Sequence, residues 1–145
     1  MATAPGSTLL TLPGRQPGHV QLVPLHPCPS SSSPASPTRT SATSQTTFRS
    51  PIILAHTHPL STLGISPSGS HIVTTSERGT LLRIWDTSRG RLERELRRGV
   101  DPAEMWGAIF ERDGKGARVA GWSDKGTIHV WGGDESKTGQ NGSRP

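Results

Sequence analysis

The sequence is poor in aromatic side chains and in cysteine. Tyrosine is absent, and only two phenylalanines and four tryptophans occur among 145 residues. So few aromatic rings leave few side chains on which nucleic-acid bases could stack. The single cysteine, Cys28, excludes an internal disulfide, offers no paired zinc ligands and fits a reduced cytosolic compartment. The first residues lack a basic stretch and a long apolar run, so neither secretion nor membrane spanning is predicted.

Apolar residues are also scarce. They make up 30% of the chain, the mean hydropathy is -0.50, and glycine and proline number 17 and 13. Such a chain can bury one modest core, and part of it is expected to stay unfolded. The net charge of +5 and the pI of about 10.7 favour anionic partners, namely nucleic acid, acidic proteins or anionic lipid surfaces. Charge alone does not choose among the three.

Short β-like runs separated by turn residues begin near Pro51. Each connection carries the Gly, Pro or Ser chemistry of a tight turn, so four successive strands form one antiparallel meander. These strands are expected at residues 60–65, 71–76, 80–86 and 91–96. A second copy, with turns at 113–116 and 123–126, is expected at residues 105–111, 117–122 and 127–131. A four-stranded meander is the size of one β-propeller blade.

An internal repeat supports this interpretation. Ser76–Thr80 matches Ser123–Thr127 at an offset of 47 residues, and each copy then reaches a tryptophan, Trp85 or Trp131. Trp85 and the aspartate after it form the dipeptide of WD repeats, whose period is roughly 40–45 residues. The predicted fold class is therefore all-β, a partial WD40-type β-propeller of about two blades with a disordered Ser/Thr/Pro-rich insertion.

The chain divides into five predicted segments. Serine, threonine and proline fill 17 of the 25 positions in residues 26–50, a composition that cannot form a packed face. Before it, His19–Val23 predicts one short isolated strand. Propellers need roughly 4–8 blades to close, so the chain is expected to be a fragment that does not close alone. The segments are a stray propeller strand (1–25), a disordered linker (26–50), a WD-type blade ending in Arg-Arg-Gly (51–99), a second, incomplete blade (100–133) and a polar tail (134–145).

No catalytic set is convincing, and an enzyme is not expected. The sequence contains no nucleophile elbow, no paired acid and base carboxylates and no phosphate-cradling glycine loop. His56 and His58 form a His-x-His pair. No third potential metal ligand lies at a sequence spacing typical of a metal site, so no metal is predicted. No cofactor is predicted either.

The informative stretch is Glu95–Gly99, with the sequence Glu-Leu-Arg-Arg-Gly. Successive side chains of an extended strand point to opposite sides, so Arg97 and Arg98 can serve two separate anion pockets. Arginine suits this task because its planar fork holds phosphate at two points and keeps its charge. The alternative is a solvated basic strand end.

Several spaced motifs resemble the PROPPIN family, the WIPI-like phosphoinositide-binding β-propellers of autophagy. The resemblance starts at Ala55-His56, passes through the turn at 76–80 and Arg83, and ends at the Arg-Arg-Gly motif. Downstream, residues 123–131 (SDKGTIHVW) resemble the next blade. Upstream, residues 12–25 (LPGRQPGHVQLVPL) resemble the preceding strand in the shorter fungal swollen-vacuole-type paralogues.

This resemblance implies two phosphoinositide sites on the propeller rim, for phosphatidylinositol 3-phosphate or the 3,5-bisphosphate. The implied residues of the first site are His56, Thr74, Ser76, Thr80, Arg83 and Arg97. Those of the second site are Arg98, Ser123, Thr127 and His129. The two histidines are expected to help more once protonated, below about pH 6.5. For the serines and threonines, the competing interpretation is ordinary turn stabilisation.

The resemblance also implies a place in the cell. A cytoplasmic protein held peripherally on vacuolar, endosomal or pre-autophagosomal membranes is expected, without nucleic acid. An autophagic lipid-transfer protein is the family's partner, but it contacts earlier blades that are missing here. The hydrophobic membrane loop of the family corresponds to residues 132–145, which carry no apolar anchor. The alternatives are a WD-repeat scaffold without lipid binding and a nonspecific basic nucleic-acid binder.

Overall fold

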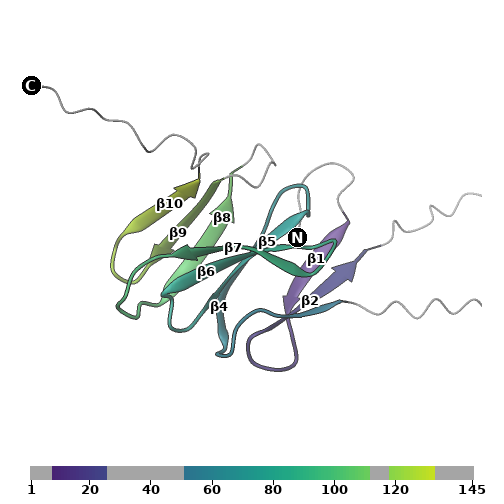
Figure 1. The fold of residues 1–145 in the computed structure, drawn as a ribbon, viewed down its shortest axis with the longest axis horizontal. Helices are drawn as coiled ribbons and strands as arrows, with labels where there is room; N and C mark the ends of the chain where they lie inside the picture. Colours follow the sequence, from purple (N-terminus) through teal and green to yellow (C-terminus); the bar gives the residue numbers. More distant parts are fainter. Residues whose placement is uncertain (1–7, 26–50, 112–117, 133–145) are drawn as a thin grey trace, which may run out of the picture.

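The computed structural model describes residues 8–25, 51–111 and 118–132. Within these ranges every regular element is a strand, and the strands form three antiparallel sheets (Figure 1). The predicted linker (26–50), the predicted turn at 113–116 and the polar tail (134–145) lie outside the described residues. The all-β prediction and the partial propeller are confirmed, with three sheets instead of about two.

The central sheet is a complete four-stranded meander in the order β4-β5-β6-β7. Its strands are β4 (Leu60–Ile65), β5 (His71–Ser76), β6 (Leu81–Asp86) and β7 (Arg91–Arg97). Each expected strand is present within a residue of its predicted ends. The turns between them fall where glycine, proline and serine gather, as predicted.

The third sheet has the order β10-β9-β8 and follows the same pattern. Its strands are β8 (Met105–Phe110), β9 (Arg118–Ser123) and β10 (Ile128–Gly132). The three strands of the predicted second copy are therefore confirmed. A fourth strand of this sheet would fall in residues beyond 132, outside those described.

The first sheet corrects the prediction of an isolated strand. Its strands are β1 (Leu9–Pro13), β2 (His19–Pro24) and β3 (Ile52–Leu54), in the order β1-β2-β3. The predicted strand at His19–Val23 is β2, and it pairs with β1 on one side and β3 on the other. The prediction was wrong because β3 is only three residues long and lies beyond the Ser/Thr/Pro-rich stretch.

The central sheet buries both of its faces. Alternate residues of one strand point to opposite faces, so neighbouring side chains enter different cores. Val73 and Leu82 pack toward the third sheet, whereas Ile72 and Trp85 pack toward the first sheet. This double burial explains the nearly continuous apolar and Thr-rich character of β5. The three sheets therefore stack side by side, with the central sheet between the other two (Figure 1).

Candidate functional site

The two arginines lie at the end of β7, where the central sheet meets both neighbours. Leu96 is buried in the core shared with the third sheet. Glu95 pairs opposite Arg83 and Arg97 opposite Leu81, so alternation places Glu95, Arg83 and Arg97 together on the face toward the first sheet. The predicted separation of Arg97 from Arg98 therefore has a clear structural basis.

Arg97 is exposed, and among the described residues no hydrogen bond or ion pair engages its guanidinium. Its backbone is held instead, because the Arg97 carbonyl oxygen accepts a hydrogen bond of 3.3 Å from Trp131 Nε1. An exposed guanidinium without such a partner can donate two hydrogen bonds to a phosphate.

Arg98 is held on the other side, at the connection to the third sheet. Its Nε donates to the carbonyl oxygen of Gly79 at 2.6 Å, and its Nη2 donates to that of Asp101. Its backbone N–H donates to the Thr80 carbonyl oxygen at 2.9 Å. Arg98 therefore holds the loop after β7 against the turn between β5 and β6. The N–H groups of its guanidinium that these contacts do not use are available to an anion.

His56, Thr74 and Trp85 form a buried polar network beneath the first predicted site. Thr74 is fully buried and His56 is 6% exposed. The Thr74 hydroxyl lies 3.0 Å from His56 Nε2 and accepts a hydrogen bond of 3.0 Å from Trp85 Nε1. These contacts satisfy the polar groups internally, which anchors the end of the first sheet to β5 and β6.

The expectation that His56 gains charge near pH 6.5 is wrong. Burial, reinforced by the positive charge of nearby Arg83, lowers the pKa of His56 to about 4. At neutral and mildly acidic pH the imidazole is uncharged. The same expectation for His129 stays a prediction.

Arg83 lies beside this network and has two partners. Its Nη1 donates to the Ala55 carbonyl oxygen at 2.7 Å, and its Nε forms an ion pair of 2.8 Å with Glu95. Arg83 therefore crosslinks the first and central sheets. Its charge is shared with a carboxylate that the predicted set did not include.

The remaining residues of the first set stabilise a turn. The Ser76 carbonyl oxygen accepts a hydrogen bond from the Gly79 N–H at 2.8 Å, and Gly79 has a φ of 58°. Thr80 contributes its carbonyl oxygen to Arg98. Their backbone groups therefore fit the competing interpretation of turn stabilisation.

The other three residues of the second set, Ser123, Thr127 and His129, lie in the third sheet or in the turn between β9 and β10. Ser123 is 2% exposed, and its hydroxyl accepts from the Lys125 N–H at 3.4 Å across the turn. Thr127 Oγ1 lies 3.2 Å from His129 Nε2, and the His129 ring stacks on Trp131 at a centroid distance of 5.5 Å. Because Trp131 also bonds the Arg97 carbonyl, β10 brings His129 close to the end of β7.

The structure thus brings most of the predicted residues to the two sides of one strand end. It also adds Glu95 and Trp131, which the sequence had not singled out as site residues. Alternation placed Glu95 on the Arg97 face, but only the register of β6 and β7 shows that Arg83 lies opposite. Among the described residues no cluster of three metal-ligating side chains occurs, and His56 is already bound to Thr74.

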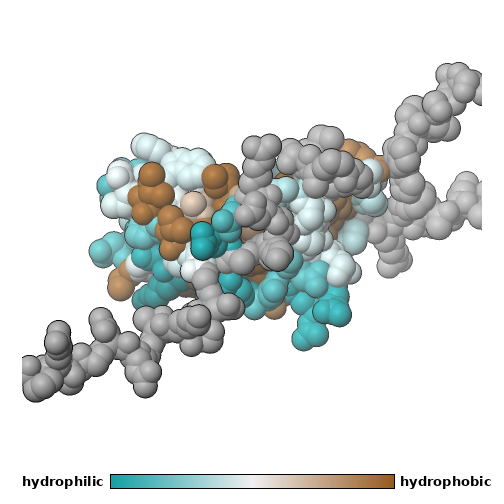
Figure 2. Space-filling view, turned by 90° about the horizontal axis from the view of Figure 1, so that it is seen from above, coloured by the Kyte–Doolittle hydropathy of each residue, from teal (hydrophilic) through white to brown (hydrophobic). Residues whose placement is uncertain are grey.

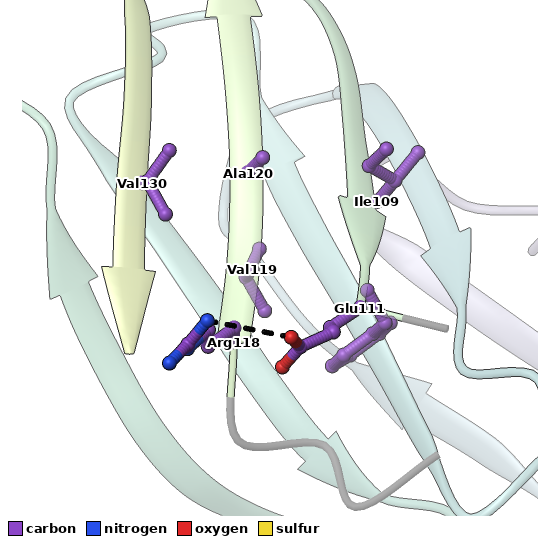
Figure 3. Close-up of a pocket in the computed structure, with 7 residues that line it drawn as sticks. Ile109, Glu111, Arg118, Val119, Ala120 and Val130 are labelled. Atoms are coloured by element: carbon purple, nitrogen blue, oxygen red, sulfur yellow. Dashed lines mark hydrogen bonds and ion pairs between the residues drawn. The ribbon is translucent and has the colours of Figure 1, made fainter. Parts of the chain in front are cut away.

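An apolar groove lies elsewhere on the described part of the chain. It has a volume of about 200 Å³, and it runs along the outer face of the third sheet (Figure 3). Its lining is Ile109, Phe110, Glu111, Arg118, Val119, Ala120 and Val130. None of the predicted site residues borders it.

The stacked antiparallel sheets define the class as a β-propeller of WD type. The β-propeller domain of Swd1 (Cps50) from Myceliophthora thermophila superposes with a TM-score of 0.58 at 17% identity, over 89% of this chain and 33% of that chain. Hsv2 from Kluyveromyces lactis superposes with a TM-score of 0.71 at 26% identity, over 94% of this chain and 37% of that one.

Relatives by sequence agree with this class. SVP1-like protein 2 of Emericella nidulans is 37% identical over 126 residues, 87% of this chain and 33% of the relative. Autophagy-related protein 18e of Arabidopsis thaliana is 38% identical over 79 residues, 54% of this chain and 21% of that protein. No protein-family profile matches the chain.

The chain belongs to the PROPPIN family, among its SVP1-like members. The family resemblance of the sequence is therefore confirmed. The chain spans about a third of the length of its Emericella relative (33%).

Proposed function

We propose that this chain binds phosphoinositides through two anion sites, one on each side of the strand end that carries Arg97 and Arg98. The headgroups are phosphatidylinositol 3-phosphate and the 3,5-bisphosphate. The observation that carries the proposal is Arg97, an exposed guanidinium on a fixed backbone without a partner among the described residues. Free arginine forks hold phosphate oxygens in two-point fashion.

The proposal gives the residues of the first site different roles, which their contacts support. Arg97 and Arg83 supply the charge, and Ser76 and Thr80 supply hydroxyls at the adjacent turn. Thr74 and His56 are buried and satisfy each other, so they support the site from below. On the other side, Arg98 supplies the charge of the second site, with Ser123, Thr127 and His129 around it.

The setting is a peripheral protein of autophagy and of vacuolar or endosomal traffic. Nothing in the part of the chain that the structure describes is a helix long and apolar enough to cross a bilayer. Two weak phosphate sites facing one membrane raise the effective concentration of each other, which gives useful avidity. An autophagic lipid-transfer protein is the partner that the family suggests.

Liposome co-sedimentation tests this function. The chain should bind vesicles with phosphatidylinositol 3-phosphate or the 3,5-bisphosphate better than vesicles matched in charge with phosphatidylserine. Arg97→Ala and Arg98→Ala should each weaken binding about tenfold, roughly the 1.4 kcal/mol of one charge-assisted contact. The double variant should abolish it, and rising salt should weaken it.

Arg91→Ala is the matched control, because Arg91 is an exposed arginine at the opposite end of the same strand. It should bind as the unaltered chain does. Equal binding to both vesicle types would indicate nonspecific basicity. If Arg97→Ala abolished vesicle binding and Arg98→Ala left it unchanged, the two-site arrangement would be refuted.

A further inference from the structure

A second groove lies where the turn between β1 and β2 meets the start of β4. One wall is formed by residues 13–19 and the other by Pro59 and Leu60, and the volume is about 270 Å³. This Arg15 groove contains none of the residues of the two proposed lipid sites. The hydrophobic residues visible in Figure 2 gather mainly at the third-sheet end, whereas the Arg15 groove combines apolar walls with a cation.

Both walls of the Arg15 groove are held by backbone hydrogen bonds. The Gly18 carbonyl oxygen accepts from the N–H groups of Ala55 and His56, at 2.9 and 3.0 Å. A Cβ on Gly18 would lie 1.8 Å from the His56 carbonyl oxygen, so the turn packs directly on the connection between β3 and β4. On the other wall, the Pro59 carbonyl oxygen accepts from the Glu77 N–H at 3.0 Å. A groove fixed on both sides needs little ordering when a ligand binds.

Arg15 supplies the positive charge of this groove. Its side chain is exposed, and among the described residues no hydrogen bond or ion pair engages its guanidinium. The described residues that line the groove include no carboxylate. An unpaired guanidinium can hold both oxygens of one carboxylate through two parallel N–H···O bonds.

Charge and volume together indicate the class of ligand. A phosphate ester carries a charge of about −1.5 to −2, which a single guanidinium balances only in part. A carboxylate carries one negative charge, which Arg15 alone can balance. The rest of the lining offers apolar surface from Pro13, Pro17, Pro59 and Leu60. Because a cavity of roughly 150 Å³ holds benzene, about 270 Å³ accommodates an acidic side chain and part of an apolar neighbour.

We propose that the Arg15 groove binds an extended acidic segment of a partner protein, with a glutamate or aspartate on Arg15 and an aliphatic side chain against the prolines. Side chains two residues apart lie on the same face of an extended segment, so both can enter the groove together. Main-chain groups and alternate side chains are the usual means by which extended peptides are recognised. This inference does not depend on lipid binding.

Nuclear magnetic resonance of the isotope-labelled full chain tests the proposal, with a blocked pentapeptide of sequence Ala-Glu-Ala-Leu-Ala as the probe. Titration should shift the Arg15 Nε signal and the amide signals of Gly14 and Gly18. The same peptide with glutamine in place of glutamate should bind about tenfold more weakly, the loss expected for one charge-assisted contact. Arg15→Ala should weaken binding of the glutamate peptide by a similar factor, because it removes the other partner of that contact.

Arg89→Ala is the matched control. Arg89 is also an arginine in a turn, with 76% of its side chain accessible, but it lies between β6 and β7. This variant should bind the glutamate peptide as the unaltered chain does. Equal losses in the two variants would overturn the proposal, because they would show that the peptide responds to net charge alone.

Two further measurements separate the acidic peptide from other ligands. Inorganic phosphate should shift the Arg15 signal less than the glutamate peptide does at equal concentration, and a larger shift would overturn the choice of a carboxylate. Arg15→Ala should bind phosphoinositide vesicles as the unaltered chain does, whereas a loss would make Arg15 part of the lipid-binding surface and refute the peptide site. An Arg15 signal that stays unshifted up to the solubility limit of the peptide would also refute it.

Discussion

Glu95 sits between the two arginines of the first proposed site. Its carboxylate holds Arg83 Nε at 2.8 Å and lies two residues before Arg97 on the same strand face. The pair is partly exposed, with 29% and 41% of the Arg83 and Glu95 side chains accessible. Such an ion pair contributes only about 0.2–1 kcal/mol, so an incoming phosphate can replace the carboxylate. The carboxylate nevertheless competes with the ligand for Arg83.

Glu95→Gln should therefore strengthen binding to phosphoinositide vesicles, by up to about fivefold from the free energy of an exposed pair. Vesicle titration would measure the gain. Glu93→Gln is the matched control, because it removes the same charge from the same strand but faces His71 instead, at 2.8 Å. If both variants gain equally, the effect is one of net charge and the competition does not exist.

The buried His56 makes a separate prediction about pH. Burial first, and then the Arg83 charge, lower its pKa from 6.5 to about 4. The unfolded chain binds a proton below pH 6.5 and the folded chain does not, so stability falls from pH 6.5 to about 4. The unfolding temperature should drop by at least about 4 °C over this window.

An NMR titration of the His56 ring gives the direct measurement, with an expected pKa of about 4. Arg83→Gln should raise that pKa part of the way back toward 6.5, because it removes the second cause and leaves the burial. A pKa near 6.5 in the unaltered chain would show that the ring is open to solvent.

Alternation along one strand was enough to predict that Arg97 and Arg98 diverge, since that property is local. Burial of Thr74 and His56 could not be predicted in the same way. Their network exists because the end of the first sheet docks on β5 and β6, and residues 26–50 separate β3 from the rest of that sheet. Sequence alone gave the residue types of the site, and long-range packing decides which of them face solvent.

At the scale of elements, the two turns of the internal repeat differ in what surrounds them. Gly79 and Gly126 occupy equivalent positions and have φ angles of 58° and 69°. Both lie in the left-handed region, where an L-residue costs roughly 1–2 kcal/mol. A Cβ on Gly79 would lie 1.8 Å from the Ala103 carbonyl oxygen, whereas one on Gly126 would meet nothing within 4 Å.

Gly79→Ala should consequently cost more stability than Gly126→Ala. The Gly126 variant should lose roughly 1–2 kcal/mol from backbone strain. The Gly79 variant should lose a further 1–3 kcal/mol or so, because the chain around Ala103 must move. Urea unfolding of both variants would measure the two losses. Equal losses would mean that the chain at Ala103 moves aside without lowering the free energy of unfolding.

Element prediction succeeded where the sequence repeats and failed where it does not. The strands of the central and third sheets were predicted within a residue or two of their ends, because Gly-containing turns separate them. β1 ends in a proline and β3 has only three residues, so neither gave a local signal. Their pairing with β2 depends on a core that Val20 and Ile53 build with the central sheet.

At the scale of the whole molecule, position in the stack decides how well each sheet is protected. The central sheet has packed neighbours on both faces, and β5 carries five buried residues out of six. In β10, by contrast, no residue is fully buried. Local opening is easiest where few apolar contacts hold the backbone, so the end sheets should open first.

Hydrogen exchange on the full chain would show this order. β5 and β6 should exchange at least about tenfold more slowly than β3 and β10, since local opening free energies range from near zero to the global value. Uniform protection from β3 to β10 would contradict the expected order, because it would mean that the three sheets open together as one unit.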